Sequence, residues 1–262
     1  KFDTLTNISR WVGLETIKEA LQDLASPNWM LALKNSAIAY VIGLLVGTIL
    51  ALLFSYYIYK KLRGAMMFRV MLFLPSVLSG VVMVAIYKVF AENLVPEILA
   101  DWFGIERELG FLGDPVTVFA AIMIYNVFMG FGIQVLMYSN AMAQIDVSVV
   151  EAAKVDGCTG FREFTKITLP MIFPTLETFV VVGVAGLFTN QLNLYSFFGE
   201  SAIPEVSTYG YMLYVKTVQA TDIMSYSEYN KLAAVGIIMT VIAAPLTFLV
   251  KQLMEKYGPS SD

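Results

Sequence analysis

A long uncharged stretch near the beginning of the chain, from Asn35 to Tyr59, limits what this sequence can fold into. A helix of about 20 apolar residues crosses the roughly 30 Å hydrocarbon core of a bilayer. Of the 262 residues, 58% are hydrophobic and only 15% are charged, whereas about a quarter of the residues of a soluble domain are charged. The sequence therefore predicts an integral membrane protein.

Four more stretches are long and apolar enough to cross a membrane, and none has the two-residue alternation of a barrel strand. They are Val70–Tyr87, Pro115–Ile145, Thr178–Gly199 and Leu232–Val250. We therefore expect an all-α polytopic membrane protein with five visible transmembrane helices. One cysteine and no histidine argue against a disulfide scaffold, a zinc site and histidine-based acid–base chemistry. A pI near 5.0 argues against nucleic acid as a partner.

The basic residues predict the orientation of these spans, because Lys and Arg collect in cytoplasmic loops. The loop after the first span carries four of them close together: Lys60, Lys61, Arg63 and Arg69. We therefore expect this loop, residues 139–168 and the C-terminus to lie in the cytoplasm. Five spans then place the N-terminal end outside. Because the chain begins with Lys1, we also expect an upstream segment with a sixth span.

The chain divides at the first span. Residues 1–34 are expected to form an extracellular lead-in, and residues 35–262 the transmembrane domain. Apolar side chains recur at helical spacing in the lead-in, as in an amphipathic helix at a membrane surface. They are Leu14, Ile17, Leu21 and Leu24.

The cytoplasmic loop at 139–168 has the pattern of a helix, a tight turn and a second helix. Ser148 and Glu151 have the spacing of a capping box, in which each side chain bonds to the other residue's backbone N–H. Gly157 suits the left-handed position that ends a helix. Pro170 suits the first turn of the next span, where its missing N–H costs nothing.

The same loop resembles the signature of a known family. Glu151-Ala152-Ala153 is followed, at the family's spacing, by Gly157 and then by Ile167-Thr168-Leu169-Pro170. This is the signature loop of the membrane subunits of ABC importers. Leu74–Phe90 and Gly13–Leu21 also resemble segments of this family, the latter in carbohydrate permeases of the maltose-transporter type. The resemblance covers nearly the whole chain.

The resemblance implies a type I ABC importer permease fold with cytoplasmic coupling helices, in a bacterial plasma (inner) membrane. It implies a transport subunit, not an enzyme, that moves a sugar or oligosaccharide by alternating access. The implied partners are an extracellular or periplasmic solute-binding protein, a second permease in a heterodimer, and a cytoplasmic ABC ATPase dimer. ATP and Mg²⁺ are expected on that ATPase and no cofactor on this chain, which lacks a G-x-x-x-x-G-K-[ST] loop.

Residues 139–168, which we call the coupling loop, are expected to contact the ATPase. The small side chains Ala152 and Ala153 would let a partner approach closely. The expected contact residues are Glu151, Ala152, Ala153, Asp156, Gly157, Ile167, Leu169 and Pro170.

Polar and aromatic side chains gather in the second half of the predicted fourth span. Polar groups inside a membrane bundle mark solute pathways, and amides and rings suit the hydroxyls and apolar faces of sugars. The resemblance places this cluster on the translocation path, and the alternative is that it anchors a helix end at the interface. The expected path residues in this cluster are Phe188, Asn190, Gln191, Asn193 and Tyr195, and Tyr125 and Asn126 of the third span are expected to join them.

Three other functions are alternatives to a sugar importer. A permease for a polyamine, phosphate or glycerol-phosphate compound would share the coupling loop but line its path with charges. A stand-alone channel would transport without ATP and without an ATPase partner. A membrane-embedded enzyme would need clustered ionisable residues at depth, and these spans hold almost none.

Overall fold

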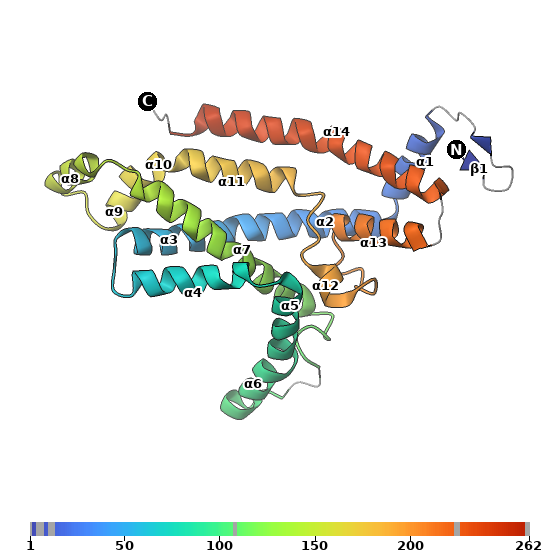
Figure 1. Ribbon diagram of the computed structural model, residues 1–262, viewed down its shortest axis with the longest axis horizontal. Coiled ribbons are helices and arrows are strands. Elements are labelled where there is room, and N and C mark those ends of the chain that lie inside the picture. The colour runs from blue at the N-terminus through green and yellow to red at the C-terminus, as the bar shows by residue number, and fades with distance from the viewer. Residues whose placement is uncertain (1, 4–7, 10–13, 107–108, 223–225, 260–262) are drawn as a thin grey trace. The chain divides into compact units, whose positions relative to one another are not determined.

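The computed structural model describes residues 2–3, 8–9, 14–106, 109–222 and 226–259, and it is helical apart from one short strand pair (Figure 1). The first elements are β1 (Phe2–Asp3), β2 (Ile8–Ser9), α1 (Glu15–Leu24), α2 (Pro27–Ile42), the π-helix η1 (Gly43–Gly47), α3 (Thr48–Tyr59), α4 (Ala65–Val77), α5 (Gly80–Val89), η2 (Phe90–Leu94) and α6 (Val95–Phe103). There follow α7 (Val118–Ala143), α8 (Val147–Val155), α9 (Phe161–Glu163), η3 (Phe164–Thr168), α10 (Leu169–Met171), α11 (Phe173–Ala185), α12 (Leu194–Phe198), α13 (Tyr209–Asp222) and α14 (Tyr226–Tyr257).

Within the described residues, three helices are long and apolar enough to cross a membrane: Pro27–Tyr59, Val118–Ala143 and Glu228–Tyr257. Two bent pairs of helices pass the same criterion together. They are Ala65–Val77 with Gly80–Phe103, bent by 105°, and Phe161–Met171 with Phe173–Ala185, bent by 67°. The helical membrane fold is thus confirmed, with five spans if each bent pair counts as one.

The second predicted span, Val70–Tyr87, is wrong as a single helix. Leu78 has φ −78° and ψ 155°, an extended conformation that ends α4, and a new helix begins at Gly80. Pro75 lies in the last turn of α4 and lacks the N–H that would continue the helical hydrogen bonds. The hydropathy of the run does not show this break, whereas Pro75 is a residue that can kink a helix.

The fourth predicted span, Thr178–Gly199, is also wrong in its boundaries. Its helix, α11, ends at Ala185, and Leu192 and Asn193 further on have φ of 49° and 57°. Residues with positive φ cannot continue a right-handed helix. The apolar run instead extends backwards through the bent pair that begins at Phe161.

The chain forms two compact units. The first comprises Lys1–Tyr40, Val84–Ile122 and Ala185–Leu246, and the second comprises Val41–Met83, Met123–Val184 and Thr247–Asp262. The predicted amphipathic helix is present in the first unit as α1, with Ala20 buried. Gly13 and most residues before it lie outside the described residues. Helix α2 runs without interruption through the expected boundary at residue 34.

Aromatic packing forms the core of the first unit. The ring centroid of Tyr209 lies 5.0 Å from that of Trp29 and 5.8 Å from that of Phe188. The backbone N–H of Tyr209 donates to the hydroxyl of Ser36 at 2.9 Å, and the amide of Asn35 faces the carbonyl oxygens of residues 204, 205 and 207 at 3.0–3.2 Å. These two polar residues of α2 therefore hold the segment before α13.

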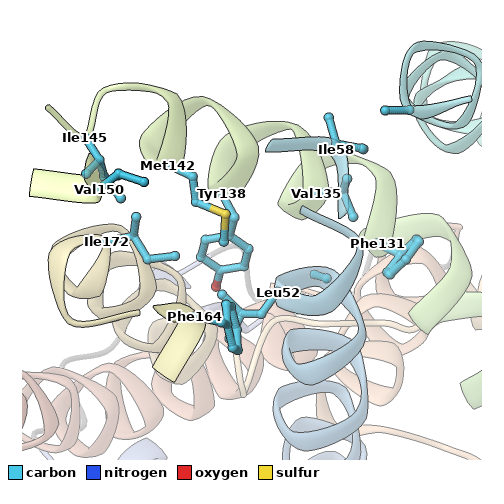
Figure 2. Packing of buried hydrophobic residues seen from close by; sticks show 12 residues of the cluster. Leu52, Ile58, Phe131, Val135, Tyr138, Met142, Ile145, Val150, Phe164 and Ile172 are labelled. Carbon is cyan, nitrogen blue, oxygen red and sulfur yellow. The ribbon is translucent and has the colours of Figure 1, made fainter. Parts of the chain in front are cut away.

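A second cluster of buried apolar side chains lies within the other unit (Figure 2). It joins α3, α7, α8 and the helices after α8. The hydroxyl of Ser55 donates to the carbonyl oxygen of Val135 at 3.0 Å, so α3 and α7 lie against each other. A Cβ atom at Gly132 would lie 2.0 Å from the carbonyl oxygen of Leu72, so only glycine allows α7 and α4 to approach this closely.

Candidate functional site

Helix α8, at the centre of the coupling loop, begins with an aspartate cap. The carboxylate of Asp146 accepts a hydrogen bond from the backbone N–H of Ser148 at 2.9 Å. Hydrogen bonds from Ser148 hold the pKa of Asp146 below its usual value. The predicted capping box is therefore wrong: Ser148 lies inside the helix, and the residue two positions earlier is the cap.

The end of α8 is a left-handed turn, as the sequence predicted. Gly157 has φ +73°, a conformation in which glycine is not strained. Its N–H donates to the carbonyl of Lys154 at 3.1 Å, and the N–H of Cys158 donates to that of Ala153 at 2.8 Å. This pair of bonds is the Schellman motif, which satisfies carbonyls that the helix leaves free.

The two faces of α8 differ in exposure. Val150 and Ala153 are buried, and in Figure 2 Val150 lies at the end of the cluster that also holds Ile145. On the other face Val155 is 88% exposed. Of the expected contact residues in this helix and its turn, four are exposed and one is buried. The exposed ones are Glu151, Ala152, Asp156 and Gly157, and the buried one is Ala153.

The remaining expected contact residues lie beyond the turn, in the helical run that begins at Phe161. Ile167, Leu169 and Pro170 are half-buried there, and Phe161 is 73% exposed. Pro170 lies in α10, which ends at Met171, so it precedes the bend rather than opening a long straight helix. These three residues therefore do not belong to the exposed turn at Gly157 but to the helical run that follows it.

A buried ion pair in this region was missed by the sequence analysis. The ammonium of Lys60 donates a hydrogen bond to the carboxylate of Glu163, whose side chain is 2% exposed. The two residues are 103 positions apart, so no local pattern connects them. The only sequence signal was the position of Glu163 between two phenylalanines, Phe161 and Phe164.

Residues 186–195, which we call the solute segment, comprise the turn between α11 and α12 and the first two residues of α12, and do not form the middle of a helix. The side-chain oxygen of Asn190 accepts the backbone N–H of Leu192 at 2.9 Å, and its backbone carbonyl accepts the hydroxyl of Thr208 at 2.9 Å. Asn193 has a left-handed backbone just before α12. This segment is therefore shaped by its own side-chain caps and by a contact with the stretch before α13.

The expected path residues differ in exposure. Asn190 and Asn193 are exposed, and Gln191, Tyr195 and Asn126 are half-buried, with the Tyr195 ring 5.0 Å from that of Tyr214. Phe188 is buried against Tyr209, and Tyr125 is buried with its hydroxyl 3.4 Å from the carbonyl oxygen of Gly80.

In the part of the chain that the structure describes, no three His, Cys, Asp or Glu side chains are grouped as they would be around a metal ion. The site therefore consists of an exposed helix with its turn and, separately, a polar turn between helices.

Comparison with known proteins gives the class of this chain. A family model described as "Binding-protein-dependent transport system inner membrane component" matches residues 43–260. The chain belongs to this family. It is a membrane component of an ABC importer and acts as a transport permease subunit.

Individual relatives agree with this assignment. The chain is 28% identical over 226 residues to the lactose transport system permease protein LacF of Rhizobium radiobacter, covering 85% of this chain and 75% of that protein. It is 28% identical over 158 residues to the maltose/maltodextrin transport system permease protein MalF of Salmonella typhimurium (strain LT2), covering 59% of this chain and 30% of that protein.

A solved structure shares the fold. The crystal structure of a bacterial ABC transporter involved in the import of the acidic polysaccharide alginate matches with a TM-score of 0.81 and 21% sequence identity. The match covers 95% of this chain and 85% of that chain. The family match thus confirms the predicted ABC importer permease, and this neighbour shares its fold.

Proposed function

We propose that this permease subunit imports a sugar or oligosaccharide. The relatives that support this proposal are named for lactose, maltose and maltodextrin transport, and the structural neighbour is named for alginate import. The polar side chains of the solute segment, Asn190, Gln191 and Asn193, are neutral amides. Amides bond to hydroxyl groups, whereas a path for polyamine or phosphate would carry opposite charges.

We further propose that the exposed face of α8 docks on a cytoplasmic ABC ATPase that holds ATP and Mg²⁺. The observation that carries this proposal is the difference in exposure between the two faces of the helix. Val150 and Ala153 are buried and hold the helix to its own unit, whereas Glu151 and Val155 are exposed. A surface-exposed valine beside a carboxylate suits a protein contact with an apolar centre and a charged rim.

The proposed assembly has four kinds of component. This chain pairs with a second permease, both rest on an ATPase dimer, and a binding protein delivers the solute from outside. Closing of the ATPase dimer moves the coupling loops and turns the pathway from one side of the membrane to the other, a rigid-body transition. The basic loop after α3 favours a cytoplasmic C-terminus in a bacterial inner membrane.

Affinity purification of the tagged chain from native membranes tests the assembly. We expect an ATPase with a P-loop and a second, similar permease to co-purify. A chain that purifies alone in several mild detergents would contradict the docking proposal and favour a stand-alone channel.

Ligand screening of the associated binding protein tests the solute class. We expect saccharides to raise its thermal stability, since a ligand that binds only the folded state stabilises it, and polyamines and phosphate to leave it unchanged. Stabilisation by a polyamine or a phosphate compound, without any saccharide effect, would contradict the proposed solute.

A further inference from the structure

The buried ion pair of Lys60 and Glu163 lies where the coupling loop meets a membrane-spanning helix. Lys60 follows directly on α3, and Glu163 is the last residue of α9. Glu163 is 2% exposed and Lys60 is 24% exposed. The carboxylate of Glu163 is therefore shielded from water at the junction between the proposed ATPase contact and the membrane domain.

Other contacts join the same two segments around this pair. The ammonium of Lys60 lies 5.3 Å from the ring centroid of Tyr56 and 5.4 Å from that of Tyr59. The hydroxyl of Tyr56 donates to the carbonyl oxygen of Gly160 at 3.0 Å, and its ring lies 4.9 Å from that of Phe164. The last turn of α3 is thus attached to the α9 region by charge, by a hydrogen bond and by ring contacts.

Stability alone is a poor explanation for such a pair. The desolvation of two charges offsets much of their attraction, and apolar side chains of similar volume often stabilise a protein equally well. A buried pair does specify one arrangement, however, because separating its partners leaves each charge without compensation. A fixed arrangement is what a mechanical connection requires.

The connection to α8 is short. Only residues 156–160 separate α8 from α9, and the hydrogen bonds of Gly157 and Cys158 fold this stretch back onto the end of α8. A displacement of α8 therefore acts on α9 at once. The charged attachment of α9 to the membrane domain is the pair at Glu163.

We propose that Lys60 and Glu163 are positioning residues that transmit the displacement of α8 to the membrane-spanning helix α3. This inference rests on the proposed docking of α8 on an ATPase. Without the pair, the ATPase still docks on the exposed face of α8 and still hydrolyses ATP. The hydrolysis is then no longer coupled to movement of the solute pathway.

The test uses the complete transporter, purified with its ATPase and binding protein and reconstituted in lipid vesicles. The readout is the ratio of solute imported to ATP hydrolysed, at equal amounts of assembled complex. Glu163→Gln and Lys60→Met each remove one charge, and Lys60→Arg keeps the charge. Lys61→Met is the matched control, because Lys61 is the exposed neighbour of Lys60.

We expect Glu163→Gln and Lys60→Met to lower the ratio about tenfold, the scale of a typical coupling between sites, and Lys60→Arg and Lys61→Met to change it less than about twofold. A purely structural role would lower the yield of complex but not the ratio. The double variant Lys60→Met with Glu163→Leu replaces the pair by apolar groups, and we expect it to assemble and to remain uncoupled.

Two results would overturn the inference. One is a normal ratio in the charge-removing variants or in the apolar double variant. The other is an equal loss in Lys61→Met. If the unmodified chain assembles with no ATPase, the docking proposal fails, and the proposed role of the ion pair fails with it. If the variants dock on the ATPase and couple normally, only the proposed role of the ion pair fails.

Discussion

The coupling loop and the solute segment each contain a turn between helices, but the chain builds the two turns by different means. The turn at the end of α8 depends on neighbours in sequence: Asp146 caps the helix through Ser148, and Gly157 ends it with a left-handed residue. The solute segment has a local cap at Asn190 but depends in addition on a distant residue, because a Cβ atom at Gly210 would lie 2.6 Å from the backbone carbonyl of Thr189.

The difference between the two turns bears on their proposed functions. A turn made by local hydrogen bonds keeps its shape when the surrounding surface changes, as a docking element must when its partner closes. A turn held by packing changes when its neighbours move, which suits a segment on a path that opens and closes.

The largest effect is expected at Gly157. No atom of this chain lies within 4 Å of a Cβ added there, so within the subunit a substitution acts through φ +73°. Gly157→Val should abolish solute-stimulated ATPase activity in the reconstituted transporter while the spans still insert, since a β-branched residue is strained in the left-handed region. Gly157→Asn is the control and should retain most of the activity, because asparagine tolerates this conformation. Equal loss in both variants would contradict a conformational cause.

The second-largest effect is expected at Gly210, where the cause is a steric clash with the backbone. The Cβ atom of Gly210→Ala meets backbone rather than a flexible side chain, so we expect a destabilisation of about 1–3 kcal/mol, the usual cost of overpacking. Thermal unfolding in detergent measures it. Gly236→Ala in α14 is the matched control, because no atom lies within 4 Å of its Cβ. Equal melting temperatures for the two variants would contradict the close approach.

The turn chemistry of the coupling loop could be predicted from the sequence, since Gly157 and the short helix before it are local features. The cap was assigned to Ser148 instead of Asp146, because both residue types cap helices and only the backbone distinguishes them. The breaks at Leu78 and near Leu192 were not predicted. Both interrupt continuous apolar runs, in which hydropathy gives the length of a span but not its bends.

The buried pair of Lys60 and Glu163 could not be predicted either. Each residue taken alone is typical of a solvated loop, and only the tertiary fold brings them together. The burial of Phe188 and Tyr125, two of the expected path residues, could not be predicted from the sequence either. Aromatic residue types that suit a sugar also suit a core.

A moderate effect is expected at Gln191, a half-buried amide of the solute segment. Gln191→Ala should raise the KM for uptake about three- to tenfold, as expected for one lost hydrogen bond of roughly 1 kcal/mol. Basal ATPase activity should stay unchanged. The exposed Gln252→Ala in α14 is the control. Uptake with a normal KM would remove this side chain from the path.

The smallest effect concerns pH at Asp146. Hydrogen bonds from Ser148 hold its pKa below the usual 3.8. A carboxyl whose pKa is lower in the folded state stabilises that state above the unfolded value, and this contribution is lost as the pH falls through the folded value. Amide exchange at Ser148, corrected for its intrinsic rate, should therefore stay slow at neutral pH and accelerate only below about pH 4. The same acceleration in Asp146→Asn, which caps without titrating, would assign it to another group.

Site-specific photo-crosslinking from the two faces of α8 tests the central claim most directly. A photoreactive residue placed at Val155, which is 88% exposed, should crosslink to the cytoplasmic ATPase in native membranes, and one placed at Val150, which is 8% exposed, should not. Crosslinks to the ATPase from Val150 but not from Val155, or from neither position in an assembled and active transporter, would contradict the proposal that this face of α8 couples ATP hydrolysis to transport.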